Sequence, residues 1–68
     1  MHAPFDIYCD GHKLATIYAN DGIEALRAYF AQTEPREVVD EYISRAYWPA
    51  GIVHVDVSHY GYVAYPRF

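Results

Sequence analysis

The sequence has a single cysteine, Cys9, and no long apolar run. One cysteine excludes a disulfide within the chain, which predicts a reducing compartment. No stretch approaches the roughly 18 apolar residues that cross a bilayer, so a membrane partner is not expected. The first residues, Met1 to Pro4, lack the cationic region and the apolar run of a secretory signal. Together these absences predict a cytoplasmic protein.

Basic residues are also few. Five lysines and arginines stand against nine acidic residues, so the net charge is −4. A dedicated nucleic-acid binder normally carries a basic face. The balance therefore disfavours direct binding to nucleic acid, whereas it suits contact with a basic surface on a protein partner.

The chain is short and rich in tyrosine. Its 68 residues allow one domain, residues 1–68, with a core so small that pairing of two copies into a homodimer would stabilise it. Eight of the residues are tyrosine. Tyrosine combines a large rigid contact area with a polar tip and is enriched at protein interfaces. Because a core of this size cannot easily bury eight tyrosines, we expect some of them at the surface.

The N-terminal part of the sequence predicts a β-hairpin. Residues Phe5 to Cys9 alternate in the manner of a half-buried strand, and Asp10-Gly11 is a strong signal for a tight turn. A second strand is expected over Lys13 to Ala19. A two-residue loop would place Leu14 opposite Ile7, and a three-residue loop would place Ala15 there, so the sequence leaves the register open.

Two helices are expected in the centre of the chain. Asp21 can cap the first helix, with Glu24 three residues later, and the segment before Pro35 ends it. Pro35 also fits the first turn of a second helix. The apolar stripe of that helix consists of Val38, Val39, Tyr42, Ile43 and Ala46.

The C-terminal part predicts a second hairpin, with strands over Ile52 to His59 and Tyr62 to Tyr65 and a turn at Tyr60-Gly61. The order β-β-α-α-β-β indicates an α+β fold, a four-stranded antiparallel sheet with two helices packed on one face. The strand order is left open. The uncovered face is expected to carry aromatic and polar side chains, from among Tyr8, Tyr18, His54, Asp56, Val63 and Tyr65.

Two groups of residues contain side-chain types that can bind a metal ion. His54 and Asp56 share a strand face, but His59 is expected to point the other way. Cys9 and His12 flank a turn, with His2 as a distant third candidate. Zinc needs three or four ligands that converge, and neither spacing provides them, so we predict no metal and no cofactor.

Catalytic machinery is not evident either. Ser58, His54 and Asp56 lie on one short strand and would project in parallel rather than relay a proton to one another. Cys9 lacks an evident activating base and oxyanion site. The sequence therefore predicts a protein that is not an enzyme.

These observations favour a non-catalytic inhibitor or regulator that covers a surface of a larger protein partner. In its small size, acidic charge and mixed α/β content, and in these features alone, the chain resembles small acidic phage-encoded proteins that block nucleic-acid-handling host-defence complexes, such as anti-CRISPR proteins. The residues expected to contact the partner are the aromatic anchors and the acidic helix residues: Tyr8, Tyr18, Tyr60, Tyr62, Tyr65, Glu37, Asp40 and Glu41. The alternative is a small nucleic-acid-binding module that stacks bases on an aromatic sheet face.

Overall fold

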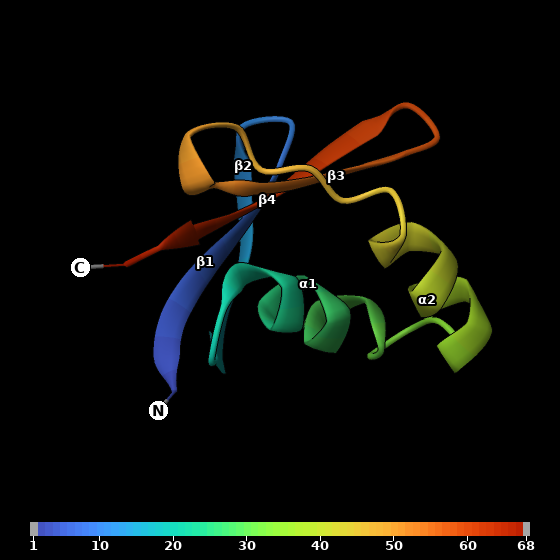
Figure 1. Cartoon of the computed structure of the whole chain (residues 1–68), viewed down its shortest axis with the longest axis horizontal. Helices are drawn as coiled ribbons and strands as arrows, with labels where there is room; N and C mark the ends of the chain where they lie inside the picture. The colour runs from blue at the N-terminus through green and yellow to red at the C-terminus, as the bar shows by residue number, and fades with distance from the viewer. Residues whose placement is uncertain (1, 68) are drawn as a thin grey trace.

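The computed structural model describes residues 2–67 and contains one antiparallel sheet and two helices (Figure 1). In chain order the elements are β1 (Ala3–Cys9), β2 (His12–Ala19), α1 (Gly22–Phe30), α2 (Arg36–Ile43), the short 3-10 turn η1 (Pro49–Gly51), β3 (Val53–Val57) and β4 (Tyr60–Pro66). The strands lie in the order β2-β1-β4-β3, so that β1 and β4 form the centre. The predicted α+β class and element order are confirmed. Within the described chain, neither helix is long and apolar enough to cross a membrane.

The first hairpin combines features of both expected registers. Its turn has two residues, Asp10 and Gly11, each with a positive φ, and Cys9 pairs with His12 across it. A bulge in β2 then adds Leu14 as an extra residue, so Ala15 becomes the partner of Ile7. Because of the bulge, the later residues of β2, such as Ile17 and Ala19, lie on the same face of the sheet as Phe5 and Ile7, which is the face that packs in the core.

Helix α1 begins as its sequence predicts. The carboxylate of Asp21 accepts a hydrogen bond from the backbone N–H of Glu24 at 2.8 Å. Gly22 follows at the first helical position and is buried against β3. A Cβ atom at Gly22 would lie only 2.7 Å from Cγ2 of Val53, so the absent side chain lets the helix approach the sheet closely.

The core lies between the sheet and the helices. Its buried residues are Phe5, Ile7, Ala19, Ala25, Leu26, Phe30, Val39, Val53, Val55 and Ala64. Three tyrosines extend it: the Phe30 ring lies 5.0 Å from that of Tyr62 and 5.2 Å from that of Tyr42, and Tyr29 packs beside them. The aromatic rings, in edge-to-face contact, fill the space between the helices and the sheet.

The turn of the second hairpin corrects the sequence interpretation. The chain reverses at Ser58 and His59, with Ser58 at φ 58°, and β4 already begins at Tyr60. Gly61 lies inside the strand, where its N–H donates to Asp10 Oδ1 at 3.1 Å. An added Cβ there would lie only 3.3 Å from Oδ1 of Asp56, the residue that pairs with Gly61 on β3. The glycine therefore marks a close approach and not the turn.

Candidate interaction surface

Helices α1 and α2 lie on one side of the sheet and leave the other face free of helices, while the segment that carries Tyr47 and leads to η1 meets this face at its β3 edge (Figure 1). We call this surface the open face. Strand pairing and side-chain alternation place ten residues on it: Pro4, Asp6, Tyr8, Lys13, Thr16, Tyr18, His54, Asp56, Val63 and Tyr65. The surface that the sequence predicted to be aromatic and polar therefore spans all four strands.

Tyr8 and Tyr65 form the aromatic centre of the open face. Tyr8 pairs with Val63 and Asp6 pairs with Tyr65, so the two tyrosines are diagonal neighbours across β1 and β4. Their ring centroids are 5.4 Å apart, with an interplanar angle of 85°. Tyr65 is 44% exposed, and Tyr18 on β2 is 66% exposed. Water thus reaches large apolar rings that a partner would desolvate on binding.

A second aromatic contact lies at the β3 edge. Tyr47, which precedes η1, bridges His54 through two backbone hydrogen bonds of 3.0 and 2.7 Å. Its ring stacks on the His54 ring with centroids 5.2 Å apart. The hydroxyl of Tyr47 donates to Asp56 Oδ2 at 3.2 Å. Burial and the neighbouring Asp56 carboxylate raise the pKa of Tyr47.

Sequence reasoning did not identify Tyr47 as part of the surface. Tyr47 lies outside the stretches whose apolar pattern predicts a helix or a strand. Its contact with His54 is an isolated β-bridge, and local sequence patterns do not predict which distant segments pair. The only sequence signal is that an aromatic pair, Tyr47-Trp48, precedes a Pro-Ala-Gly turn. Trp48 is also largely exposed.

A charged network occupies the other half of the open face. The Arg67 guanidinium donates two hydrogen bonds to Asp6, from Nη2 to Oδ1 at 2.6 Å and from Nε to Oδ2 at 3.1 Å. Thr16 donates to Asp6 Oδ1 at 2.7 Å, and Lys13 Nζ lies 3.4 Å from the same oxygen. The hydrogen bonds from Arg67 and then Thr16 lower the pKa of Asp6 to about 2. This carboxyl is therefore ionised at any physiological pH.

The structure separates the predicted contact residues into three locations. Tyr8, Tyr18 and Tyr65 share the open face. Tyr60 and Tyr62 have the opposite parity along β4, which turns them toward the helix side. Tyr62 packs against the core, whereas Tyr60 at the start of the strand is 56% exposed.

The three acidic residues, Glu37, Asp40 and Glu41, are exposed on α2, across the molecule from the open face. Asp40 pairs with Arg27, and Glu41 pairs with Arg45. A flat partner surface can therefore touch the open-face tyrosines or these carboxylates, but not both.

The two layers of the fold also differ in charge. The helices and their connections carry six acidic residues and three arginines, a net −3, with the acidic residues at Asp21, Glu24, Glu34, Glu37, Asp40 and Glu41. The open face and its turns carry Lys13 and Arg67 against Asp6, Asp10 and Asp56, a net −1. Acidity is thus concentrated on the helix side.

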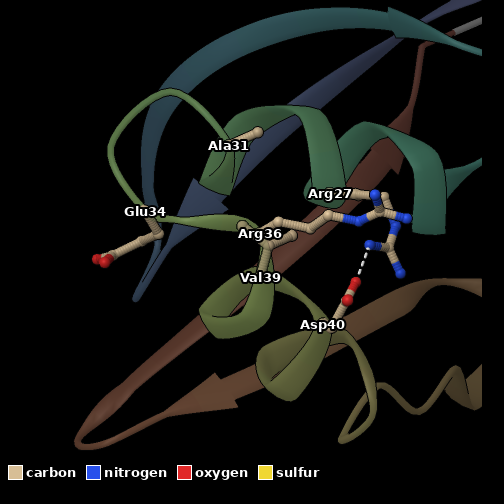
Figure 2. A pocket seen from close by; sticks show the side chains of 6 residues that line it. All are labelled: Arg27, Ala31, Glu34, Arg36, Val39 and Asp40. Carbon is tan, nitrogen blue, oxygen red and sulfur yellow. Dashed lines mark hydrogen bonds and ion pairs between the residues drawn. The ribbon is translucent and has the colours of Figure 1, made fainter.

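A shallow hollow of about 650 Å³ lies between α1 and the start of α2. Figure 2 shows the side chains that line it: Arg27, Ala31, Glu34, Arg36, Val39 and Asp40. Arg27 binds Asp40, the guanidinium of Arg36 lies beside that of Arg27, and Glu34 points away (Figure 2). The lining includes no nucleophile, and its charged groups are open to water, so the hollow lacks the dry, convergent groups of an active site.

The candidate metal ligands do not assemble within residues 2–67, where no group of three His, Cys, Asp or Glu side chains lies together. His54 and Asp56 share the open face, but His59 lies in the turn after β3. The Cys9 thiol lies 4.0 Å from Asp10 Oδ2, and burial together with that carboxylate raises its pKa. A raised pKa keeps the thiol protonated and poorly nucleophilic.

Comparison with known proteins gives no match, since no family model fits the chain and neither a curated protein nor a solved structure is similar to it. Function must therefore be inferred from the surfaces of the molecule. The open face is the surface that combines exposed aromatic rings with fixed charges.

Proposed function

We propose that this chain is a non-catalytic inhibitor or regulator that binds a larger protein through its open face and covers a surface of that partner. The observation that carries the proposal is the uncovered sheet face, on which Tyr8, Tyr18 and Tyr65 surround an ordered charge network. Exposed aromatic side chains on a rigid sheet lose little conformational entropy on binding and bury a large area. The β-sheet holds them in place before the partner arrives, which reduces the cost of association.

Charge supports a protein partner over a nucleic acid. Both cations of the open face, Lys13 and Arg67, already lie against Asp6. Contacts to phosphates require cations that are free to replace counterions. A face with a net charge of −1 supplies no such excess. The acidic helix side adds long-range attraction to a partner with a basic surface, such as a complex that holds nucleic acid, and small acidic phage proteins that inhibit such complexes share this format.

Single-stranded nucleic acid is the second candidate ligand, favoured by one observation. Tyr18 on β2 and Tyr65 on β4 are exposed on the same face of an antiparallel sheet, on the two strands that flank β1, as in sheets that stack bases on aromatic rings. A titration with a fluorescent single-stranded oligonucleotide at low salt tests it. Salt-dependent binding that is lost in Tyr65→Ala would favour nucleic acid over a protein ligand.

A photo-crosslinking experiment tests the protein-binding proposal with a matched control on the same strand. A benzophenone amino acid replaces Tyr65 on the open face or, as the control, Tyr60 on the opposite side; both positions are exposed. We expect irradiation in native lysate to link the Tyr65 position, and not the Tyr60 position, to one discrete protein. Tyr65→Ala, but not Tyr60→Ala, should weaken binding to that purified protein by about tenfold or more, as for an interface hot spot.

Equal crosslinking from both positions would contradict the assignment of the open face. A crosslink from Tyr65 to a second copy of the chain would replace the larger partner with a homodimer.

A further inference from the structure

Arg67 occupies a defined position on the open face. The residue follows β4, and its backbone N–H donates to the carbonyl of Pro4 at 3.0 Å. From there its side chain crosses β1 and reaches β2, where Nη2 donates to Thr16 Oγ1 at 3.1 Å in addition to the two bonds to Asp6. One guanidinium thus engages both oxygens of a carboxylate and a hydroxyl on the next strand. This fork-to-fork arrangement is specific for arginine.

The groups that receive Arg67 are built into the sheet. Asp6 and Thr16 are paired neighbours on β1 and β2, and the Thr16 hydroxyl orients the carboxylate. The Asp6 side chain is only 17% exposed, whereas that of Arg67 is 45% exposed. The carboxylate therefore belongs to the sheet surface, while the guanidinium lies over it. Tyr18 and Tyr8 lie near enough to Arg67 to contribute to its raised pKa, after the larger effect of Asp6.

We propose that Asp6 and Thr16, flanked by Tyr8 and Tyr18, form a guanidinium-binding site that Arg67 fills in the free protein and that accepts an arginine of the protein partner in the complex. This inference rests on the proposed function, because the site lies on the open face. Arginine suits it for two reasons: the carboxylate is ionised, and the acceptor oxygens match a planar fork. Tyr8 and Tyr18 lie two residues from Asp6 and Thr16 on the same face of their strands, where they can contact the same partner. The net charge of −4 adds attraction to a cationic partner.

The contact between Arg67 and Asp6 limits how tightly any other guanidinium group can bind at this site. Arg67 is tethered beside the site, so its effective concentration is high and free arginine competes poorly. A partner's arginine displaces it only because the surrounding tyrosines add contacts to the same partner. Removal of the Arg67 side chain leaves Asp6 Oδ2 and the Thr16 hydroxyl without their donor, whereas Lys13 Nζ remains 3.4 Å from Asp6 Oδ1. A small guanidinium compound should then be able to enter the vacated position.

The test uses N-acetyl-arginine amide as the probe and amide chemical shifts as the readout. In Arg67→Ala, we expect saturable shifts at Asp6, Thr16 and Tyr8 with a dissociation constant in the millimolar range, and much smaller shifts with N-acetyl-lysine amide. The intact protein and Asp6→Asn/Arg67→Ala should show no saturation. Arg45→Ala is the matched control, since it removes an exposed arginine that pairs with Glu41 on the helix side.

Two results would overturn the site: no saturable shift in Arg67→Ala, or the same shift in the double variant that lacks the carboxylate. Should Arg67→Ala fail to fold, Arg67→Gln keeps a hydrogen-bond donor near Asp6 while removing the charge and the fork, and the same two results apply to it.

The crosslinked partner separates this inference from the proposed function. If a partner arginine replaces Arg67, Arg67→Ala should bind the partner about two- to fivefold more tightly, since an exposed ion pair no longer has to open, and Asp6→Asn should bind it more weakly. Tyr65 crosslinks that persist without any effect of Arg67→Ala or Asp6→Asn would refute the guanidinium site and leave the proposed function standing. Arginine binding without a Tyr65 crosslink would refute the proposed function alone.

Discussion

Replacement of Gly22 by alanine tests how tightly α1 packs on the sheet. The added Cβ would lie 2.7 Å from Cγ2 and 3.1 Å from Cβ of Val53, whereas carbon atoms pack best at about 3.5–4.0 Å. Val53 cannot easily move away, because it is β-branched, nearly buried and paired with Ala64 in the ladder. The added methyl group therefore forces the helix or the strand to shift.

The magnitude follows from two opposing effects. Overpacking of this kind costs about 1–3 kcal/mol, and the better helix propensity of alanine returns up to ~1 kcal/mol. We expect Gly22→Ala to lower the free energy of unfolding by about 1–2 kcal/mol. At roughly 0.05–0.15 kcal/mol per residue, a domain of this size has only ~3–10 kcal/mol in total. The melting temperature should fall by about 4–8 °C for each kcal/mol lost.

Urea unfolding followed by far-UV circular dichroism measures the effect, and Val53→Ala provides the control. That variant alone should lose about 1–2.5 kcal/mol, because two methyl groups leave the core. In the double variant Val53→Ala removes the 2.7 Å contact with Cγ2 and leaves the 3.1 Å contact with Cβ, so the combined loss should be smaller than the sum by about 1 kcal/mol. Additive losses, or a Gly22→Ala protein as stable as the wild type, would refute the close packing of α1 on β3.

Three further changes test other contacts. The pKa of Asp6 is about 2 in the folded protein against its usual 3.8, so its stabilising contribution is present above pH ~4 and is lost as the pH falls toward 2; acid titration of Asp6→Asn should lack this part of the pH dependence, and an unchanged profile would contradict it. Ala50 has a φ of 53°, so Ala50→Gly should raise the free energy of unfolding by about 0.5–1 kcal/mol in the same urea assay, and a loss of stability would count against strain there. Asp21→Ala removes the cap on Glu24 and should cost about 1 kcal/mol; an unaffected melting temperature would show that the cap contributes nothing.

Local signals in the sequence were sufficient for most of the fold. Asp10-Gly11 predicted its turn because that dipeptide tolerates positive φ at both positions, and Asp21 predicted the start of α1 because its side chain can accept a first-turn N–H. The turn at Ser58-His59 was missed because Gly61 gave the stronger local signal. The close contact at that glycine is with Asp56, its partner across the β3–β4 ladder.

The candidate surface was predictable only in part. Tyr8 and Tyr65 were assigned to the uncovered face by alternation alone, which strand parity fixes once each strand is known. Tyr62 lies three residues before Tyr65 on the same strand, so alternation already gave it the opposite parity, and its choice as a contact residue was based on tyrosine content rather than on its face. The pairing of Asp6 with Arg67 depends on β1 lying beside β4, and no local rule states which strands become neighbours.

The central position of β1 and β4 has a consequence for how the molecule forms. Ile7 pairs with Ala64, so nearly the whole chain lies between two residues that meet in the middle of the sheet. Each hairpin can form early, because its two strands are close in the sequence. The ladder between β1 and β4 forms later, because bringing these distant strands together costs loop-closure entropy. During synthesis the two halves would remain unjoined until β4 has left the ribosome. The same ladder brings Ile7 and Ala64 together in the core, so we expect the core and the open face to be completed in one step.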